Sequence, residues 1–259
     1  TWLGGQTFKL LIAVVAIGIM FEFTKIVKNR MAYLPRVFAW LFLLLCVIAW
    51  GLQNYATALV IALVAFGALA VWEWMLNRGI WSATGFAYAA LPFFAMTALR
   101  GEEFEGLLLI IILFACVWGA DVFAYFAGKG IGGPKLAPSI SPKKTWAGFI
   151  GSLVGAAIMS WLVIHFAGYQ AGMAFFAIVV IIAVVSQVGD LFESVLKRKF
   201  GVKDSGSIIP GHGGILDRID GLIFSSVVLW LWLLFLSGGS LYLNQLGGLF
   251  AAAFLSPTN

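Results

Sequence analysis

The sequence predicts an all-α integral membrane protein: a polytopic helix bundle with about eight to nine transmembrane helices and a polar pocket on the cytoplasmic side. Of its 259 residues, 62% are hydrophobic and only 10% are charged, whereas soluble domains carry about a quarter charged residues. Its mean hydropathy is +1.02, and the apolar residues form long runs. Because backbone polar groups in lipid must be satisfied internally, such runs are expected to form helices.

Eight apolar segments are each about long enough to cross, or nearly cross, a bilayer as a helix, for which roughly 20 residues are needed. They cover 7–27, 37–52, 56–76, 84–99, 106–127, 147–167, 172–192 and 221–237. A shorter ninth candidate, 241–255, is expected to be interfacial or a partial span. No linker divides the chain, so residues 1–259 are expected to form a single membrane domain.

Positive charge predicts the orientation. With eight alternating spans, the loops 28–36, 77–83, 128–146 and 193–220 share one side and hold 13 of the 16 Lys and Arg residues. This side is therefore expected to be cytoplasmic. The net charge of +5 is then explained by cations close to the anionic lipids of the cytoplasmic leaflet, and it is not a sign of nucleic-acid binding. The count also places Thr1 outside, which fits a further helix upstream.

Three features of the spans predict packing rather than chemistry. Cys46 and Cys116 lie far apart in apolar runs without the spacing of metal ligands, so both are expected to be small buried hydrophobic residues without a disulfide. The segment Gly151–Gly155 matches G-x-x-x-G and predicts close helix packing within the bundle.

Glu22 and Glu73 each lie between two aromatic residues at the cytoplasmic end of a span. This repeated aromatic-Glu-aromatic pattern is consistent with an old duplication. The favoured interpretation is an interfacial glutamate that pairs with a nearby Lys25 or Arg78.

The loop 128–146 begins with a formal G-x-G-x-x-G at Gly128–Gly133. A dinucleotide-binding fold needs this pattern between a strand and a helix. Here it follows a membrane helix and runs into Pro134, which excludes that fold and leaves a flexible loop.

Lys143 and Lys144 close this loop. Ser141 or Thr145 is expected to cap the next helix, with Pro142 near its first turn. Two lysines at a helix N-terminus suit an anionic group such as phosphate. Ordinary cytoplasmic lysines explain them equally well.

Asp121 lies in the last turns of the span 106–127, with Tyr125 one turn further on the same face. A carboxylate at that depth is costly, and intramembrane acids usually face a polar cavity and serve a function. A structural partner for a lysine or a buried hydroxyl is the alternative, and function is favoured.

Four carboxylates bracket the polar stretch 203–221. Asp190 and Glu193 end the seventh span, and Asp217 and Asp220 begin the eighth. Two antiparallel helices are expected to bring these acids to the same cytoplasmic end. Oxygen ligands select hard cations, above all Mg²⁺, and the chain shows no Cys or His cluster for zinc.

Basic residues and glycines lie between these acids. Positioning and charge neutralisation are what phosphoryl transfer requires of a protein, although any single pair is equally a plain salt bridge. The cations are Lys197, Arg198, Lys199 and Lys203. The glycines, which are expected to let the backbone approach a ligand closely, are Gly206, Gly211, Gly213 and Gly214.

The run from Ser194 to Asp220 resembles the signature of phosphatidate cytidylyltransferases, also called CDP-diacylglycerol synthases. It reads S-V-L-K-R, four residues, K-D-S-G, two residues, and I-P-G-H-G-G-I-L-D-R-I-D. Upstream, the stretches Gly119–Lys129, Ser141–Trp146 and Gly189–Ser194 are also similar to the bacterial members. The similarity covers roughly residues 118–221, and the N-terminal spans match only in character.

The resemblance implies Mg²⁺-dependent transfer of CMP from CTP to phosphatidic acid in phospholipid biosynthesis, giving CDP-diacylglycerol and pyrophosphate. It also implies a bacterial cytoplasmic membrane, a second cation as an option, and a homodimer. The residues expected to be catalytic are Asp190, Asp217, Lys203 and Asp220. The residues expected to bind substrate are Asp121, Lys143, Lys144, Ser194, Lys197, Arg198, Asp204, His212 and Arg218. The expected metal ligands are Asp190, Asp217, Asp220 and Glu193.

Two other classes of membrane protein share features with this sequence. CDP-alcohol phosphotransferases share the beginning D-x-x-D-G, which Asp217–Gly221 matches, but a purely apolar helix follows here instead of further aspartates. A transporter could use Asp121 and Asp190 as an ion path. It should then carry polar residues near mid-membrane on several helices, whereas most polar residues here lie at the cytoplasmic end.

Overall fold

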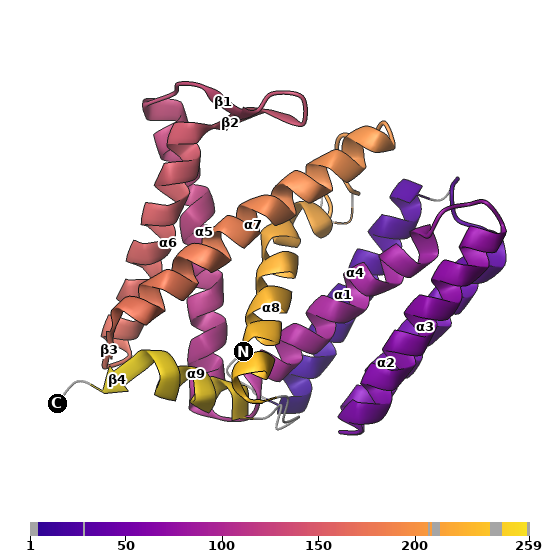
Figure 1. Cartoon of the computed structure of the whole chain (residues 1–259), viewed down its shortest axis with the longest axis horizontal. Coiled ribbons are helices and arrows are strands. Elements are labelled where there is room, and N and C mark those ends of the chain that lie inside the picture. Colours follow the sequence, from indigo (N-terminus) through magenta and orange to yellow (C-terminus); the bar gives the residue numbers. More distant parts are fainter. Residues whose placement is uncertain (1–4, 28, 207, 209–212, 239–244, 258–259) are drawn as a thin grey trace. The chain divides into compact units, whose positions relative to one another are not determined.

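A computed structural model describes residues 5–27, 29–206, 208, 213–238 and 245–257, and this part of the chain contains nine helices and four short strands (Figure 1). The helices are α1 Gly5–Val27, α2 Tyr33–Gly51, α3 Tyr55–Met75, α4 Trp81–Arg100, α5 Phe104–Gly130, α6 Trp146–Phe166, α7 Met173–Lys199, α8 Leu216–Leu236 and α9 Leu246–Phe254. The strands are β1 Lys135–Ala137, β2 Ser141–Thr145, β3 Tyr169–Ala171 and β4 Leu255–Pro257.

Eight of these helices, α1 to α8, are long and apolar enough to cross a membrane. The predicted all-α polytopic class is therefore confirmed, with most helix ends within a few residues of the prediction. The largest differences are that α7 continues to Lys199 and that α8 already begins at Leu216. With 9 residues, α9 is about 14 Å long, too short to span. The rest of that ninth candidate includes residues 241–244, which lie outside the described residues.

The chain divides into two compact units, which are described separately. The N-terminal unit comprises residues 5–97 and 197–219. It contains α1 to α3, most of α4, the last residues of α7 and the first turn of α8. The C-terminal unit comprises residues 98–196 and the chain from 220 onward.

In the N-terminal unit, α2 and α3 lie side by side (Figure 1). The rings of Phe38 and Trp72 are 5.5 Å apart between them. Helices α1 and α4 also approach closely, because a Cβ on Gly85 would lie 2.6 Å from the ring of Phe23. Aromatic rings and a glycine thus set the helix spacing in this unit.

The structure corrects the interpretation of Glu22 and Glu73. Both side chains are fully buried, at 0% exposure, and both bind the beginning of another helix. Glu73 accepts hydrogen bonds at 2.6 Å from both the backbone N–H and the hydroxyl of Ser82, at the start of α4. Glu22 accepts one at 2.8 Å from the backbone N–H of Leu216, at the start of α8. Helix N-termini expose unpaired N–H groups, and these take the place of the expected lysine or arginine.

In the C-terminal unit, α5 and α6 are in close contact along their length, which confirms the packing predicted from G-x-x-x-G. A Cβ on Gly119 would lie 2.9 Å from the carbonyl oxygen of Gly155. A Cβ on Gly155 would overlap both that opposing backbone and the side chain of Phe123. The two backbones therefore pass each other where only glycines fit.

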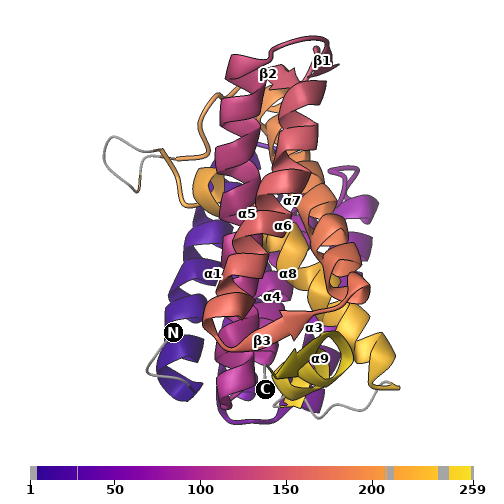
Figure 2. The ribbon, with the colours of Figure 1, turned by 90° about the vertical axis from the view of Figure 1, so that its left-hand side faces the viewer.

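A two-stranded hairpin, β1–β2, connects α5 to α6 where a flexible loop was expected (Figures 1 and 2). Lys135 pairs with Thr145, and an irregularity separates this pair from Ala137 and Ser141. Thr145 caps α6 as expected, since its hydroxyl accepts a 3.1 Å hydrogen bond from the N–H of Gly148. Ser141 is not the cap.

Pro142 and the two lysines occupy the strand β2 rather than the first turn of α6. The expected position of Pro142 was therefore wrong. At the other end of the α5–α6 pair, β3 pairs with β4 next to α9 (Figure 1). Cys46 and Cys116 are free and fully buried, as predicted.

We expect Gly155→Leu to lower the free energy of unfolding by about 1–3 kcal/mol or more, because the added side chain must force α5 and α6 apart. The control is Gly67→Ala in α3, where an added Cβ meets nothing within 4 Å. It should be neutral or slightly stabilising. Thermal unfolding in detergent measures both variants. Equal stability of Gly155→Leu and the wild type would contradict the packing described.

Candidate active site

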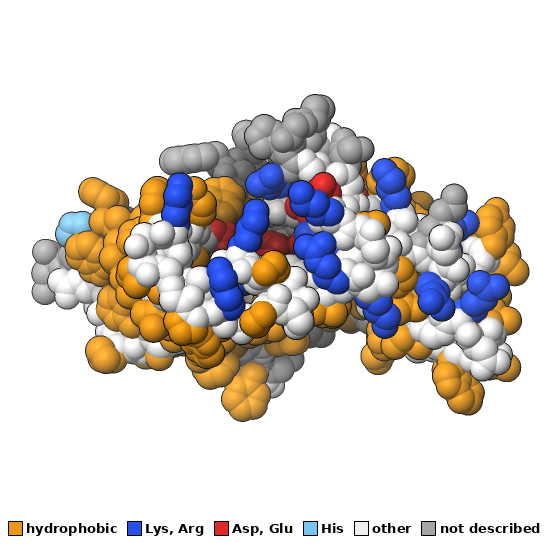
Figure 3. Space-filling view, turned by 90° about the horizontal axis from the view of Figure 1, so that it is seen from above, with side chains coloured by type: hydrophobic (Ala, Val, Ile, Leu, Met, Phe, Trp, Pro, Cys, Tyr) orange, Lys and Arg blue, Asp and Glu red, His pale blue; other side chains and the backbone are white. Residues whose placement is uncertain are grey.

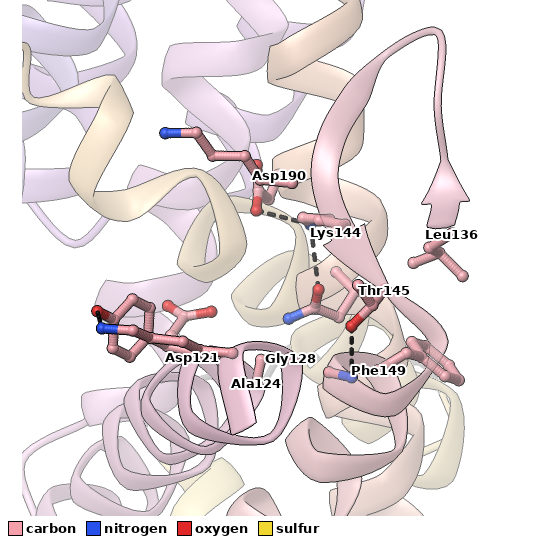
Figure 4. A pocket seen from close by; sticks show the side chains of 13 residues that line it. Asp121, Ala124, Gly128, Leu136, Lys144, Thr145, Phe149 and Asp190 are labelled. Carbon is pink, nitrogen blue, oxygen red and sulfur yellow. Dashed lines mark hydrogen bonds and ion pairs between the residues drawn. The ribbon is translucent and has the colours of Figure 1, made fainter. Parts of the chain in front are cut away.

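A cavity of about 460 Å³ opens in the C-terminal unit, between α5, the hairpin, the start of α6 and α7 (Figure 4). This volume lies in the range of roughly 300–1,000 Å³ that is typical of small-molecule sites. Its polar lining includes Asp121 from α5, Lys143 and Lys144 from β2, and Gln187 and Asp190 from α7. Four residues predicted from the sequence to belong to the site thus lie around one cavity.

Lys144 is the central contact of this cavity. Its Nζ lies 2.6 Å from Oδ2 of Asp190 and donates a 3.1 Å hydrogen bond to Oε1 of Gln187 (Figure 4). On the other side, the hydroxyl of Ser194 donates to Oδ1 of Asp190 at 3.4 Å. The lysine side chain is only 17% exposed, so this ion pair is less screened than one in open water.

Local structure fixes the position of Lys144. The residue directly precedes Thr145, the cap of α6, and the N–H of Trp146 closes the base of the hairpin by donating to the carbonyl of Pro134 at 3.1 Å. The lysine thus sits where a strand meets a helix. The N-terminal end of a helix is electropositive, so α6 and the lysines favour an anion in this cavity.

Three carboxylates from three helices interact electrostatically here: Asp121 on α5, Asp190 on α7 and Asp220 on α8. Lys144 offsets part of their mutual repulsion. Tyr125 also lines the cavity, which confirms that it shares a face of α5 with Asp121. A group of acids that repel one another attracts cations.

Two glycines bring α7 and α8 together beside these acids. A Cβ on Gly189 would lie 2.7 Å from the carbonyl oxygen of Asp220. A Cβ on Gly221 would overlap the hydroxyl of Ser186. The carboxylate of Asp220 accepts a 2.7 Å hydrogen bond from the N–H of Gly221. Close packing of the two helices thus places an acid of α8 near those of α5 and α7.

The lining of the cavity combines charges of both signs. It includes Lys129, Lys143 and Lys144 as well as Asp121 and Asp190, and many Lys and Arg side chains are visible on the surface seen from above (Figure 3). A cavity with this lining favours anionic ligands while keeping carboxylates available to a cation.

Asp217 lies in the N-terminal unit, where four hydrogen bonds hold its carboxylate. Oδ1 accepts from Nζ of Lys197 at 2.7 Å. Oδ2 accepts from the N–H of Ser205 at 2.9 Å, from its hydroxyl at 2.8 Å and from the N–H of Gly214 at 2.9 Å. The predicted neighbours Asp217 and Lys197 are therefore in direct contact.

The acids fit Mg²⁺ in their chemistry. In the described part of the chain, no three His, Cys, Asp or Glu side chains are grouped as a metal site. However, Asp190 and Asp217 each hold an ammonium group, at 2.6 and 2.7 Å. Each of these two carboxylates thus contacts a positive charge through an oxygen atom, and Mg²⁺ prefers oxygen ligands.

The remaining predicted residues fall into three groups. Glu193 is fully buried in α7. The exposed ones are Arg198, Lys203, Asp204 and Arg218. His212, like Gly211, lies outside the described residues.

Gly206 and Gly214 approach a buried side chain rather than open space for a ligand. A Cβ on Gly206 would lie 2.8 Å from the carboxyl carbon of Glu22, and one on Gly214 would overlap the hydroxyl of Ser205. The expectation that these two glycines admit a ligand is therefore wrong.

The sequence reasoning missed Gln187, Ser205 and the role of Glu22. Gln187 was detectable, because it is a polar residue in an apolar span, one turn before Asp190. Ser205 is a small polar residue in a polar loop and carries no such signal. The partners of Glu22 lie more than 180 residues away, and no local pattern reveals them.

Comparison with known proteins gives matches over most of the chain. A sequence model of the "Cytidylyltransferase family" matches residues 1–236. A protein named phosphatidate cytidylyltransferase from Brucella abortus (strain 2308) is 40% identical over 233 residues, which are 90% of this chain and 86% of that protein. Proteins of the same name from Rickettsia bellii and Haemophilus influenzae are 38% and 42% identical over 65% and 53% of this chain, and over 76% and 52% of their own lengths. With a match this extensive, the chain belongs to the cytidylyltransferase family.

Proposed function

We propose that this protein transfers CMP from CTP to phosphatidic acid, giving CDP-diacylglycerol and pyrophosphate. The observation that carries the proposal is the 40% identity over 90% of the chain to proteins named phosphatidate cytidylyltransferase. The basic, acid-containing cavity supports it independently, because both substrates are anionic. The transporter alternative receives no support from the family match.

The reaction needs little covalent chemistry from the protein. A phosphate oxygen of phosphatidic acid attacks the α-phosphorus of CTP, a new P–O bond forms, and the bond to the β-phosphate breaks to release pyrophosphate. Catalysis then consists of positioning and charge neutralisation. Lys143 and Lys144 are the groups proposed to bind phosphate oxygens in the cavity, which Lys129 also lines.

Mg²⁺, when bound, supplies charge neutralisation on the triphosphate and the leaving pyrophosphate. Asp190 and Asp217 are the proposed ligands, with Asp220 and Glu193 in support. Each of the first two acids is paired with a lysine. If Mg²⁺ replaced Lys144 and Lys197 as the partners of these acids, the two lysines could bind phosphate groups.

The setting also fits a lipid substrate. The protein is a multi-pass membrane protein with eight candidate spans, and its matches are bacterial. We propose that it resides in the bacterial inner membrane with the cavity on the cytoplasmic side, where CTP is available. The homodimer expected from the resemblance stays a prediction.

The purified protein should release pyrophosphate from CTP only when phosphatidic acid and Mg²⁺ are both present. Chelation of the metal should stop the release, and fresh Mg²⁺ should restore it, because the triphosphate charge is otherwise not neutralised. A coupled pyrophosphate assay in mixed micelles measures this, with diacylglycerol in place of phosphatidic acid as the control. If the folded protein releases no pyrophosphate, the proposed function is wrong.

Lys144→Gln should raise the KM for CTP roughly ten- to hundredfold, since a hydrogen bond to a charged group is worth about 1.5–3 kcal/mol. The matched control is Lys135→Gln, on the same hairpin but outside the lining of the cavity. This control removes the same charge and should leave KM nearly unchanged. Equal effects of the two variants would mean that the general positive field, and not Lys144, binds the nucleotide.

A further inference from the structure

Glu22 connects the first helix to a segment almost 200 residues later in the chain. Its buried carboxylate accepts hydrogen bonds from the N–H of Ile215 at 3.0 Å and the N–H of Leu216 at 2.8 Å, and it lies 3.1 Å from the hydroxyl of Ser205. A carboxylate without contact to water needs such donors. The positions of Ser205, Ile215 and Leu216 therefore depend on Glu22.

Ser205 extends this connection to Asp217. The serine is 2% exposed, and its hydroxyl lies within hydrogen-bonding distance of both acids, at 3.1 Å from Glu22 and 2.8 Å from Asp217. Its backbone N–H also donates to Asp217, at 2.9 Å. One residue thus fixes the distance between the two carboxylates.

Gly206 and Gly214 show how closely the chain approaches Glu22. A Cβ on Gly206 or on Gly214 would overlap the oxygens of the Glu22 carboxylate. Gly18, one turn before Glu22 on α1, is equally close to the side chain of Ile215. Gly206, Gly214 and Ile215 are therefore packed directly against α1.

We infer that Glu22 is a positioning residue for the transfer reaction, acting through Ser205 to set the orientation of the Asp217 carboxylate. This inference rests on the proposed function and on Asp217 as a metal ligand. Groups that orient metal-binding carboxylates typically contribute ten- to hundredfold to metal affinity or activity. A helix outside the signature region would then belong to the catalytic apparatus.

Glu73 offers a matched control in the same unit. Like Glu22, it is a fully buried glutamate between two aromatic residues, here Trp72 and Trp74 near the end of α3, and it also binds the first turn of another helix. Its hydrogen bonds go to Ser82 rather than to the signature segment. Glu22→Gln and Glu73→Gln therefore remove the same charge from the same kind of site, but only Glu22 contacts a residue, Ser205, that also contacts Asp217.

The test compares these variants by two measurements on full-length protein in detergent. One is the steady-state rate of pyrophosphate release, and the other is binding of Mn²⁺ alone, followed by electron paramagnetic resonance without substrates. For Glu22→Gln we expect roughly ten- to hundredfold lower kcat and roughly tenfold weaker Mn²⁺ binding. The KM for CTP should change much less. Glu73→Gln should lose comparable thermal stability yet keep kcat and Mn²⁺ affinity within about twofold of the wild type.

The inference is overturned if both variants lose stability and activity in parallel and bind Mn²⁺ equally well, since Glu22 would then only hold the fold together. If Glu22→Gln does not fold, Ser205→Ala decides. A loss of kcat and Mn²⁺ affinity in that variant supports the inference, and wild-type values contradict it. A wild-type protein that releases no pyrophosphate contradicts the proposed function instead, and the Mn²⁺ measurements stay interpretable on their own.

Discussion

A carboxylate on a membrane-spanning helix must receive hydrogen bonds or a positive charge, because neither lipid nor an apolar core can replace its hydration. The main polar contacts of this protein follow from that requirement. Glu22 and Glu73 are satisfied by the first N–H groups of other helices. Asp190 and Asp217 are satisfied by lysines. The first pair holds helices in place, whereas the second keeps acids and cations together in a form that substrates can rearrange.

The spans could be predicted from the sequence because long apolar runs admit only helices. Their ends were less predictable, since α7 continues past its apolar part to Lys199 and α8 starts at Leu216, so that it includes the charged residues Asp217, Arg218 and Asp220. The hairpin β1–β2 escaped prediction, because its strands are short and polar and show no alternation of apolar residues. Which residues of β1 pair with which residues of β2 is known only from the folded structure.

The candidate site could be predicted in its residue types but not in its partners. Charged residues in an apolar chain are conspicuous, so Asp121, Lys144 and Asp190 were all found. Which lysine pairs with which acid depends on how the hairpin and α7 pack, and local sequence does not encode that. The glycines illustrate the same limit. Gly206 signals a close approach, but whether a ligand or a side chain approaches is decided by α1, far away in the sequence.

The contact between α1 and the signature segment also has a consequence for biosynthesis. Chains are made from the N-terminus and their parts fold as they emerge, so α1 exists long before Ser205, Ile215 and Leu216 are translated. During that interval Glu22 lacks the donors that it has in the finished fold. Helix α1 therefore gains these contacts only when most of the chain has been made. An incomplete chain, truncated before residue 205, would keep an unsatisfied acid in its first helix and be a natural target for quality control.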